Sequence, residues 1–143
     1  MILAVIRVKG GFKIKKGLKD TFSLMRLNKK HHCVLLEDNP INLGMIRKVQ
    51  DFITWGEIDE ETLKSLILKR GRLPGNKRVE LSEKELNSLV KKLLKGEGTK
   101  IKPVFRLSPP KKGWERGTIK LRYPRGALGP RGSEINSLIK RMF

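Results

Sequence analysis

The stretch ILAVIRVKGG, residues 2–11, decides the fold that the sequence predicts. Its first seven residues, Ile2–Val8, are rich in β-branched side chains, and the pair Gly10-Gly11 bounds the run. We therefore expect a strand over 2–8. The apolar run Met1–Ile6 is too short for a signal peptide or a membrane-spanning helix.

Two helices and a second strand follow. Apolar residues four and three positions apart predict a helix over about 15–27, and a short strand is expected over 33–36. A second helix begins at Asn39-Pro40 and runs to about residue 53. Asparagine caps a helix, and proline at the first helical position gives up no needed N–H. The order up to this point is β-α-β-α.

A pair of helices comes next. Asp59 caps a third helix, which ends at Gly71. Ser82 and Glu85 form a capping box that begins a fourth helix, and this helix ends at Gly96.

The last part of the chain has less regular patterning. A strand is expected over 104–107, and a short final helix begins at Ser133. Between them, residues 109–132 show neither helical nor strand periodicity. A segment of this length without regular structure is usually functional or disordered.

The net charge of +19 on 143 residues indicates a polyanionic partner. Residues 1–36 hold nine lysines and arginines against one acid, and residues 100–143 hold twelve against two. Residues 37–99 hold twelve against eleven, so the middle is nearly neutral. Nucleic acid is the first candidate partner and an anionic membrane surface the second. The uneven distribution favours a binding footprint built from both ends of the chain.

Cellular location follows from cysteine usage and helix composition. The single cysteine, Cys33, excludes an intrachain disulfide and fits a reducing compartment. No expected helix pairs a basic face with bulky aromatic insertion residues, which argues against a membrane partner. We therefore expect a soluble, cytoplasmic protein.

Three alternative sites are weaker than nucleic-acid binding. His31-His32-Cys33 alternate in direction along a strand and cannot all face one metal ion. The glycines over 126–132 lack the flanking strand, helix and Gly-Lys-Ser/Thr ending of a phosphate-binding loop. Most acids lie at helix starts, where caps and dipoles explain them. We therefore expect no enzyme, catalytic residue, metal, cofactor or small-molecule substrate.

The candidate RNA-binding residues are basic side chains near both ends, because lysine and arginine neutralise phosphates and release counterions. Trp114 lies among Lys111, Lys112 and Arg116, where an indole suits stacking on an unpaired base. The alternative that Trp114 folds back on the domain stays open. The full set is Lys9, Lys13, Lys15, Lys16, Arg26, Lys29, Lys30, His31, Arg47, Lys48, Arg106, Lys111, Lys112, Trp114, Arg116, Lys120, Arg122, Arg125 and Arg131.

Four stretches resemble a known family. They are GLKDTFSLMRLNKKHHCVLLED (17–38), NPINLGMIRKVQDFITWGEID (39–59), VFRLSPPKKGW (104–114) and GSEINSLIKRM (132–142). They resemble large-subunit ribosomal protein thirty in its archaeal form, whose eukaryotic counterpart is numbered seven. The resemblance covers essentially the whole chain.

The resemblance implies an α+β fold with a ferredoxin-like β-α-β-α-β core. This core would have a three-stranded antiparallel sheet with the first strand central, helices on one face, an inserted helical pair and a basic C-terminal extension. The implied units are 1–56, the first part of the core; 57–98, the inserted helices; 99–108, the third core strand; and 109–143, the basic loop and last helix.

The resemblance also implies a structural constituent of the large ribosomal subunit. Its partners would be large-subunit ribosomal RNA and neighbouring ribosomal proteins. Family contacts would map onto Lys9–Lys16, Arg26–Lys30 and Arg47-Lys48, where Gly44 permits close approach of RNA or of the sheet. A free RNA-binding regulator or a ribosome assembly factor is the alternative.

Overall fold

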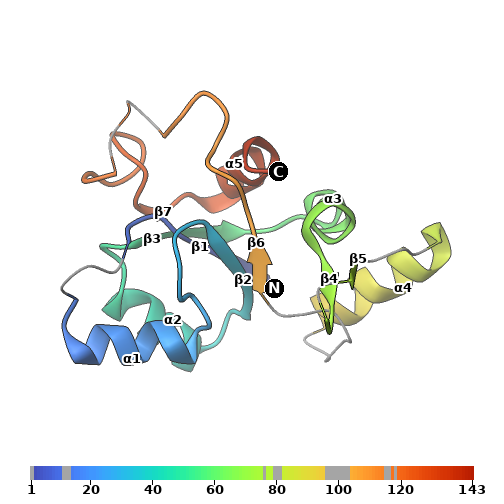
Figure 1. The fold of residues 1–143 in the computed structure, drawn as a ribbon, viewed down its shortest axis with the longest axis horizontal. Coiled ribbons are helices and arrows are strands. Elements are labelled where there is room, and N and C mark those ends of the chain that lie inside the picture. Colours follow the sequence, from blue (N-terminus) through green and yellow to red (C-terminus); the bar gives the residue numbers. More distant parts are fainter. Residues whose placement is uncertain are drawn as a thin grey trace.

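A computed structural model of the chain describes residues 2–10, 14–75, 77–78, 82–95, 104–114, 117 and 119–143. In these residues one five-stranded sheet has the order β6-β2-β1-β3-β7 (Figure 1). The first elements are β1 (Ile2–Arg7), α1 (Lys16–Leu24), β2 (His32–Glu37), α2 (Pro40–Lys48) and β3 (Ile53–Glu57). The predicted α+β class and the β-α-β-α order are confirmed.

The first strand is central because both of its faces are apolar. All six residues of β1 are buried. Side chains of alternate residues point to opposite faces of a strand, and accordingly Ala4 and Ile6 belong to one core cluster, whereas Leu3 and Val5 belong to another.

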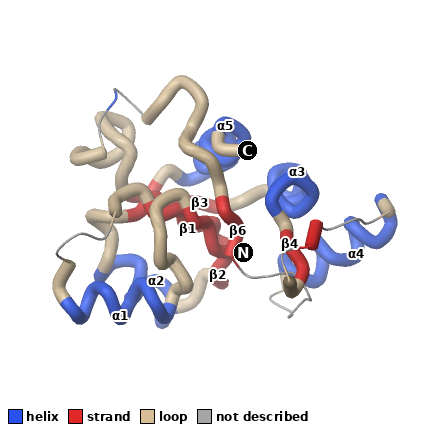
Figure 2. Tube along the Cα trace, viewed as in Figure 1, coloured by secondary structure: helices blue, strands red, loops and turns tan. Residues whose placement is uncertain are grey.

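Helices cover both faces of the sheet. The cluster around Leu3 is completed by Phe22 of α1 and Ile46 of α2, while the cluster around Ala4 includes Leu66 of α3 (Glu60–Arg70) and Leu138 of α5 (Ile135–Arg141). The tube view shows the same layers, with α1 and α2 below the strands and α5 above them (Figure 2). The two helices between the first three strands, α1 and α2, therefore share one face, and the inserted helix α3 and the last helix α5 cover the other.

Three of the predicted helix starts are confirmed by their caps. The Asn39 side-chain oxygen accepts from the backbone N–H of Asn42 at 2.8 Å, and that of Asp59 accepts from Thr62 at 2.7 Å. Ser82 and Glu85 form a reciprocal capping box at 3.4 Å, which begins α4 (Glu83–Leu94). The prediction that Ser133 caps the last helix was wrong, because Ser133 lies in a 3-10 helix and α5 begins at Ile135 without a side-chain cap.

The prediction of three strands was wrong. On one side β1 pairs with β2, and on its other side it pairs with β3, a strand that was not predicted from the sequence. The expected strand at 104–107 exists as β6 (Val104–Arg106), but it pairs with β2 at the edge of the sheet. Gly56 weakens the strand pattern of β3. It is nevertheless required there, because a Cβ would clash with the Gly132 carbonyl oxygen and the Ile135 side chain.

The C-terminal segment folds back onto the sheet. Its strand β7 (Gly129–Pro130) pairs in parallel with β3, and Ala127 and Leu128 form a small apolar cluster with Val8. A short 3-10 helix over Gly132–Glu134 then leads into α5. In its described part, this segment is thus neither a free loop nor structureless.

The inserted residues form a helical pair and a hairpin. Leu86 and Val90 of α4 join the core cluster that contains α3. Between the helices, β4 (Arg72–Leu73) and β5 (Lys77–Arg78) make a separate two-stranded sheet. None of the helices in the described part of the chain has the length and apolar character that crossing a membrane requires.

Candidate nucleic-acid interface

Three segments that are distant in sequence meet at one end of the sheet, where β1 ends, β2 begins and β6 ends. The backbone N–H of His31 donates to the Arg7 carbonyl oxygen at 2.8 Å, and that of Leu107 donates to the His31 carbonyl oxygen at 3.2 Å. His32 lies directly opposite Arg106 in the β2–β6 ladder. This end of the sheet therefore brings together candidates from both basic ends of the sequence.

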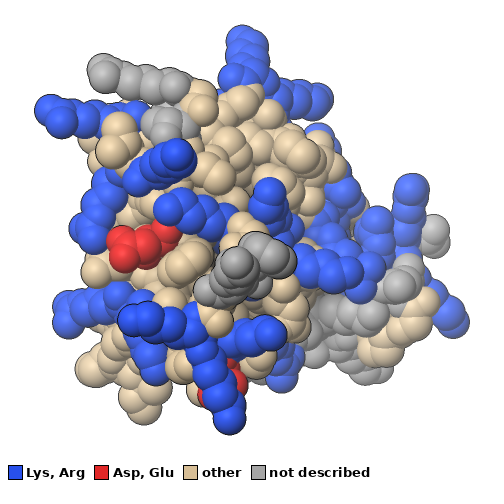
Figure 3. Space-filling model, turned by 60° about the vertical axis from the view of Figure 1, so that its left-hand side comes forward, with Lys and Arg blue, Asp and Glu red and all other residues tan. Residues whose placement is uncertain are grey.

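We call this region the sheet-end surface and define it by its candidate residues Lys9, Lys29, Lys30, His31, Arg106 and Trp114. Lys29, Lys30 and Arg106 are exposed. Within the described residues, none of these cations forms an ion pair with an acid. Lysines and arginines are widespread on the face drawn in Figure 3, with few acids among them. Cations without acidic partners attract phosphate groups.

Trp114 is held against the domain. Its ring stacks on the His31 ring with a centroid separation of 5.9 Å and an angle of 13° between the planes. The half-buried indole also packs against two of the apolar clusters. The alternative in which Trp114 folds back on the domain is confirmed, so at least one ring face is already occupied within the chain.

A second group of candidates lies where α1 begins and α2 ends. A Cβ at Gly17 would lie 3.7 Å from the Lys48 Nζ, which places these two helix ends side by side. Lys15, Lys16, Arg47 and Lys48 are all exposed there. We call these four residues the helix-end group.

Gly44 lies in α2, one turn before the helix-end group. It is exposed, and a Cβ there would meet nothing within 4 Å. Of the two expected reasons for this glycine, close approach of the sheet is therefore wrong. Close approach of a binding partner is the reason that stays open.

Strained backbone conformations occur at candidate RNA-binding residues. Among the described residues, the non-glycine residues with positive φ are Arg26 (62°), His31 (65°) and Lys112 (66°), and all three are candidates. Arg26 ends α1 with the hydrogen-bond pattern of a Schellman motif, in a position that favours glycine. Such conformations cost free energy and gather at functional sites.

The remaining candidates lie on the C-terminal segment. Lys111, Lys112, Lys120, Arg122 and Arg125 are exposed. The Arg122 guanidinium lies 3.7 Å from an Asp51 carboxylate oxygen across an exposed surface. The candidates Lys13 and Arg116 lie outside the described residues.

Arg131, which the sequence predicts as an RNA-binding residue, is not a surface cation. Its side chain is only 6% exposed. Its Nε donates to the Thr54 hydroxyl oxygen at 2.7 Å and its Nη2 to the Ala127 carbonyl oxygen at 3.0 Å. The guanidinium also lies 4.9 Å from the centre of the Tyr123 ring. Arg131 therefore fastens the C-terminal segment to β3.

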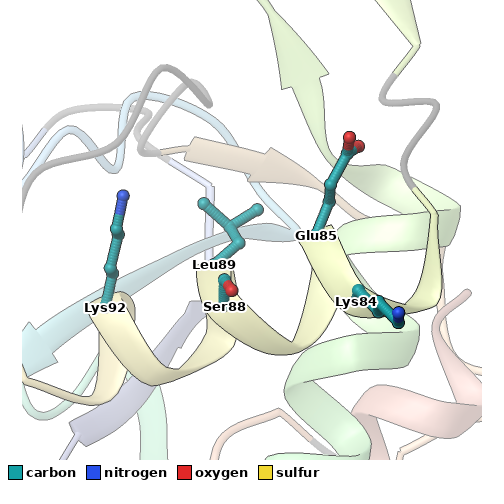
Figure 4. Close-up of a pocket in the computed structure, with 5 residues that line it drawn as sticks. All are labelled: Lys84, Glu85, Ser88, Leu89 and Lys92. Atoms are coloured by element: carbon teal, nitrogen blue, oxygen red, sulfur yellow. The ribbon is translucent and has the colours of Figure 1, made fainter.

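A pocket of about 370 Å³ lies along α4. It is lined by Lys84, Glu85, Ser88, Leu89 and Lys92 (Figure 4). No described candidate residue lines it, so the pocket is separate from the sheet-end surface.

Comparison with known proteins gives a consistent match. The family model for ribosomal protein L30p/L7e matches residues 3–53. A protein of Methanococcus vannielii named large ribosomal subunit protein uL30 is 48% identical over the full length of both chains. The protein of that name from Methanococcus maripaludis is 46% identical to this chain over the full length of both. The one from Archaeoglobus fulgidus is 39% identical to it over 99% of each chain. The chain belongs to the uL30 family.

The extent of these matches bears on the inserted helices and the C-terminal segment. The uL30 family model ends at the start of β3, whereas the archaeal uL30 relatives align over the whole chain. The inserted helical pair and the C-terminal segment are therefore shared with these archaeal relatives. The family is one of structural ribosomal proteins and not of enzymes.

Arg7 of this uL30 chain is a positioning residue that the sequence did not reveal. Its side chain is 3% exposed, and its guanidinium lies 4.0 Å from the centre of the Phe22 ring. Its Nη1 donates to the Leu27 carbonyl oxygen at 2.6 Å and its Nε to the Lys9 carbonyl oxygen at 2.9 Å. Burial lowers the pKa of Arg7. An arginine within an apolar strand was the available signal, since such a residue is buried only with partners.

His31 of the sheet-end surface and the adjacent His32 both favour their neutral forms. Burial, followed by the charge of Lys30, lowers the pKa of His31. Burial lowers the pKa of His32, and the charges of Arg106 and Lys29 act in the same direction. The Nδ1 atoms of both rings are buried without a hydrogen-bond partner.

Cys33 belongs to the core. Its thiol is fully buried, and burial raises its pKa to about 12. In the described part of the chain, no three histidine, cysteine or acidic side chains are grouped so that they could hold a metal ion.

Proposed function

We propose that this chain is a structural constituent of the large ribosomal subunit in the cytoplasm and that it binds large-subunit ribosomal RNA. The observation that carries the proposal is the sheet-end surface, where cations from both ends of the sequence meet without acidic partners. Its occupants would be phosphate groups, because such contacts dominate affinity for RNA. The relatives' name supports the assignment to the large subunit.

The strained residues support the same surface. Arg26 and His31 flank Lys29 and Lys30, and each takes a conformation that costs free energy in the isolated chain. Lysine and arginine side chains held in fixed directions lose less entropy when they contact a phosphate. We therefore assign the turn over 26–31 the main role in binding.

The architecture supports a finer description of the core. Residues 2–57 contain β1, α1, β2, α2 and β3 in an antiparallel arrangement with β1 between the other two strands. This is the layout of a ferredoxin-like core, to which the inserted helices, β6 and the C-terminal segment are added. Neighbouring ribosomal proteins are the proposed further partners.

Salt-dependent binding tests the proposal. The variant Lys29→Gln/Lys30→Gln should bind transcribed large-subunit ribosomal RNA about tenfold or more weakly at about 0.15 M salt, with a salt slope shallower by about 1.4–1.8. The variant Lys84→Gln/Lys91→Gln removes the same charge from exposed positions of α4 and serves as the matched control. Equal effects of the two variants would show that net charge alone governs binding.

Sedimentation separates a constituent from the alternative, a free regulator or assembly factor. A constituent should remain with the mature large-subunit peak of a sucrose gradient after a high-salt wash. A protein found only with precursor particles, or only at the top of the gradient, would be an assembly factor or a regulator instead.

A further inference from the structure

The near-neutral middle of the chain conceals a strongly basic segment. Residues 62–79 hold six lysines and arginines and no acid, whereas residues 37–61 hold seven acids and only two bases. The near neutrality of residues 37–99 is therefore an average over segments of opposite sign. The basic segment contains the end of α3 and the hairpin β4–β5.

The hairpin places like charges directly opposite each other. Arg72 of β4 faces Arg78 of β5, and Leu73 faces Lys77. Like charges at opposed positions destabilise a strand pair. A hairpin of two residues in each strand is marginally stable by itself, so an anion bound near the two arginines would stabilise it.

Lys77 and Arg78 are available to that anion. Both are exposed, and within the described residues neither forms an ion pair or a side-chain hydrogen bond. The Arg72 Nη1 donates to the Gly71 carbonyl oxygen at 2.9 Å, which holds its guanidinium at the base of the hairpin. Gly75 has a φ of 85° and open space around it, so a partner can approach the turn closely.

The surrounding residues fix the hairpin rather than compete for the anion. The Arg70 Nη2 donates to the Ser108 hydroxyl oxygen at 2.6 Å, which ties the end of α3 to the start of the C-terminal segment. The Lys69 Nζ lies 4.9 Å from the centre of the Phe143 ring. The Lys64 Nζ lies 3.6 Å from a Glu60 carboxylate oxygen. Three of the six cations thus have partners within the domain, and the hairpin presents the other three.

We infer that the β4–β5 hairpin is a second binding site for RNA, which takes the phosphodiester backbone. Successive phosphates of a single-stranded or helical RNA backbone can contact Arg72, Lys77 and Arg78, because these three cations lie close together on the hairpin. A protein partner is less suited, because Leu73 packs into the core and Pro74 is the one exposed apolar residue among the described residues of the hairpin. This inference rests on the proposed function and adds a site far from α1 (Figure 1).

The variant Lys77→Gln/Arg78→Gln tests the site in the full chain. Binding to transcribed large-subunit ribosomal RNA should weaken about tenfold or more at about 0.15 M salt, and the salt slope should become shallower by about 1.4–1.8. The control Lys84→Gln/Lys91→Gln should leave the slope unchanged. Hydroxyl-radical footprinting with the hairpin variant should lose one patch of backbone protection and keep the patch that depends on Lys29 and Lys30.

Stability provides an independent readout. Removal of Arg78 relieves the repulsion from Arg72, so the hairpin variant should unfold at the same temperature as the unmodified chain or at a higher one. A lower unfolding temperature would show that these side chains are structural and would overturn the inference.

The remaining outcomes are distinct. Unchanged RNA binding and footprint in the hairpin variant would overturn the second site while leaving the proposed function intact. If that variant bound RNA normally but failed to join particles, the site would belong to a protein partner. If the unmodified chain bound ribosomal RNA no better than an unrelated RNA of equal length, the proposed function itself would fail.

Discussion

Among single residues, Gly44 and Gly56 have opposite surroundings. Gly44 is exposed inside α2 with open space where a Cβ would stand, whereas Gly56 is buried against Gly132 and Ile135. Gly44→Ala should stabilise the isolated protein by about 0.5–1 kcal/mol, because glycine in a helix costs conformational entropy. It should weaken RNA binding, because the added methyl group blocks close approach. Urea unfolding and filter binding measure the two effects.

Gly56→Ala is the control for this prediction. Its Cβ would clash with backbone, so it should destabilise the protein by about 1–3 kcal/mol. An RNA affinity of Gly44→Ala equal to that of the unmodified chain would contradict the close-approach explanation and leave Gly44 without a role.

The case of Arg131 shows why some site residues could not be predicted from the sequence. Arg125 and Arg131 both stand in the same proline- and glycine-rich segment, so composition treats them alike. Only pairing of β7 with β3 brings Arg131 within 2.7 Å of the Thr54 hydroxyl oxygen, 77 positions away. Local patterns locate exposed charge, but they do not show which cation a distant strand will bury.

Among elements, helix starts were predictable because the signal is local. The caps at Asn39, Asp59 and Ser82 depend on residues within three positions of each other. The strand β3 was missed because it has five residues, includes a glycine and begins soon after α2 ends at Lys48. Its place beside β1 depends on burial of both faces of the sheet, which is a property of the assembled layers.

The geometry of the caps predicts unequal stability effects. Asn39→Ala should cost about 1 kcal/mol of unfolding free energy, because the Asn42 N–H at 2.8 Å loses its acceptor. Ser82→Ala should cost about 0.5 kcal/mol or less, since the bonds of that capping box are 3.4 Å long and exposed. Urea unfolding of both variants makes the comparison, and a larger loss for Ser82→Ala would contradict it.

For the whole molecule, the charge distribution predicted the kind of partner but not the arrangement of the surface. The two basic ends do converge, through the hydrogen bonds that join β1, β2 and the residue after β6. The basic hairpin was hidden, because the acids before and after it cancel its charge in any long window. Folding separates these charges in space, which an average along the sequence cannot show.

The meeting of the two basic ends of the chain around His31 and His32 makes the stability of the whole molecule depend on pH. Burial and neighbouring cations lower the pKa values of His31 and His32 in the folded state, whereas in the unfolded chain a histidine titrates near about 6.5. Below that pH the histidines bind protons in the unfolded state more readily than in the folded state. The contribution of the two neutral histidines to the free energy of unfolding is therefore complete above about pH 6.5. It is lost as the pH falls toward the lowered pKa values of these histidines in the folded state.

Urea unfolding at about pH 7.5 and about pH 5.5 should accordingly give a smaller unfolding free energy at the lower pH, in a range where most carboxylates stay ionised. The double variant His31→Asn/His32→Gln should flatten this dependence, and asparagine tolerates the positive φ of residue 31. Bound RNA should reverse the trend, because a phosphate near His31 favours the protonated ring, so affinity should rise as the pH falls. An unfolding free energy that stayed constant between the two pH values would show that the rings are solvated rather than held in the fold.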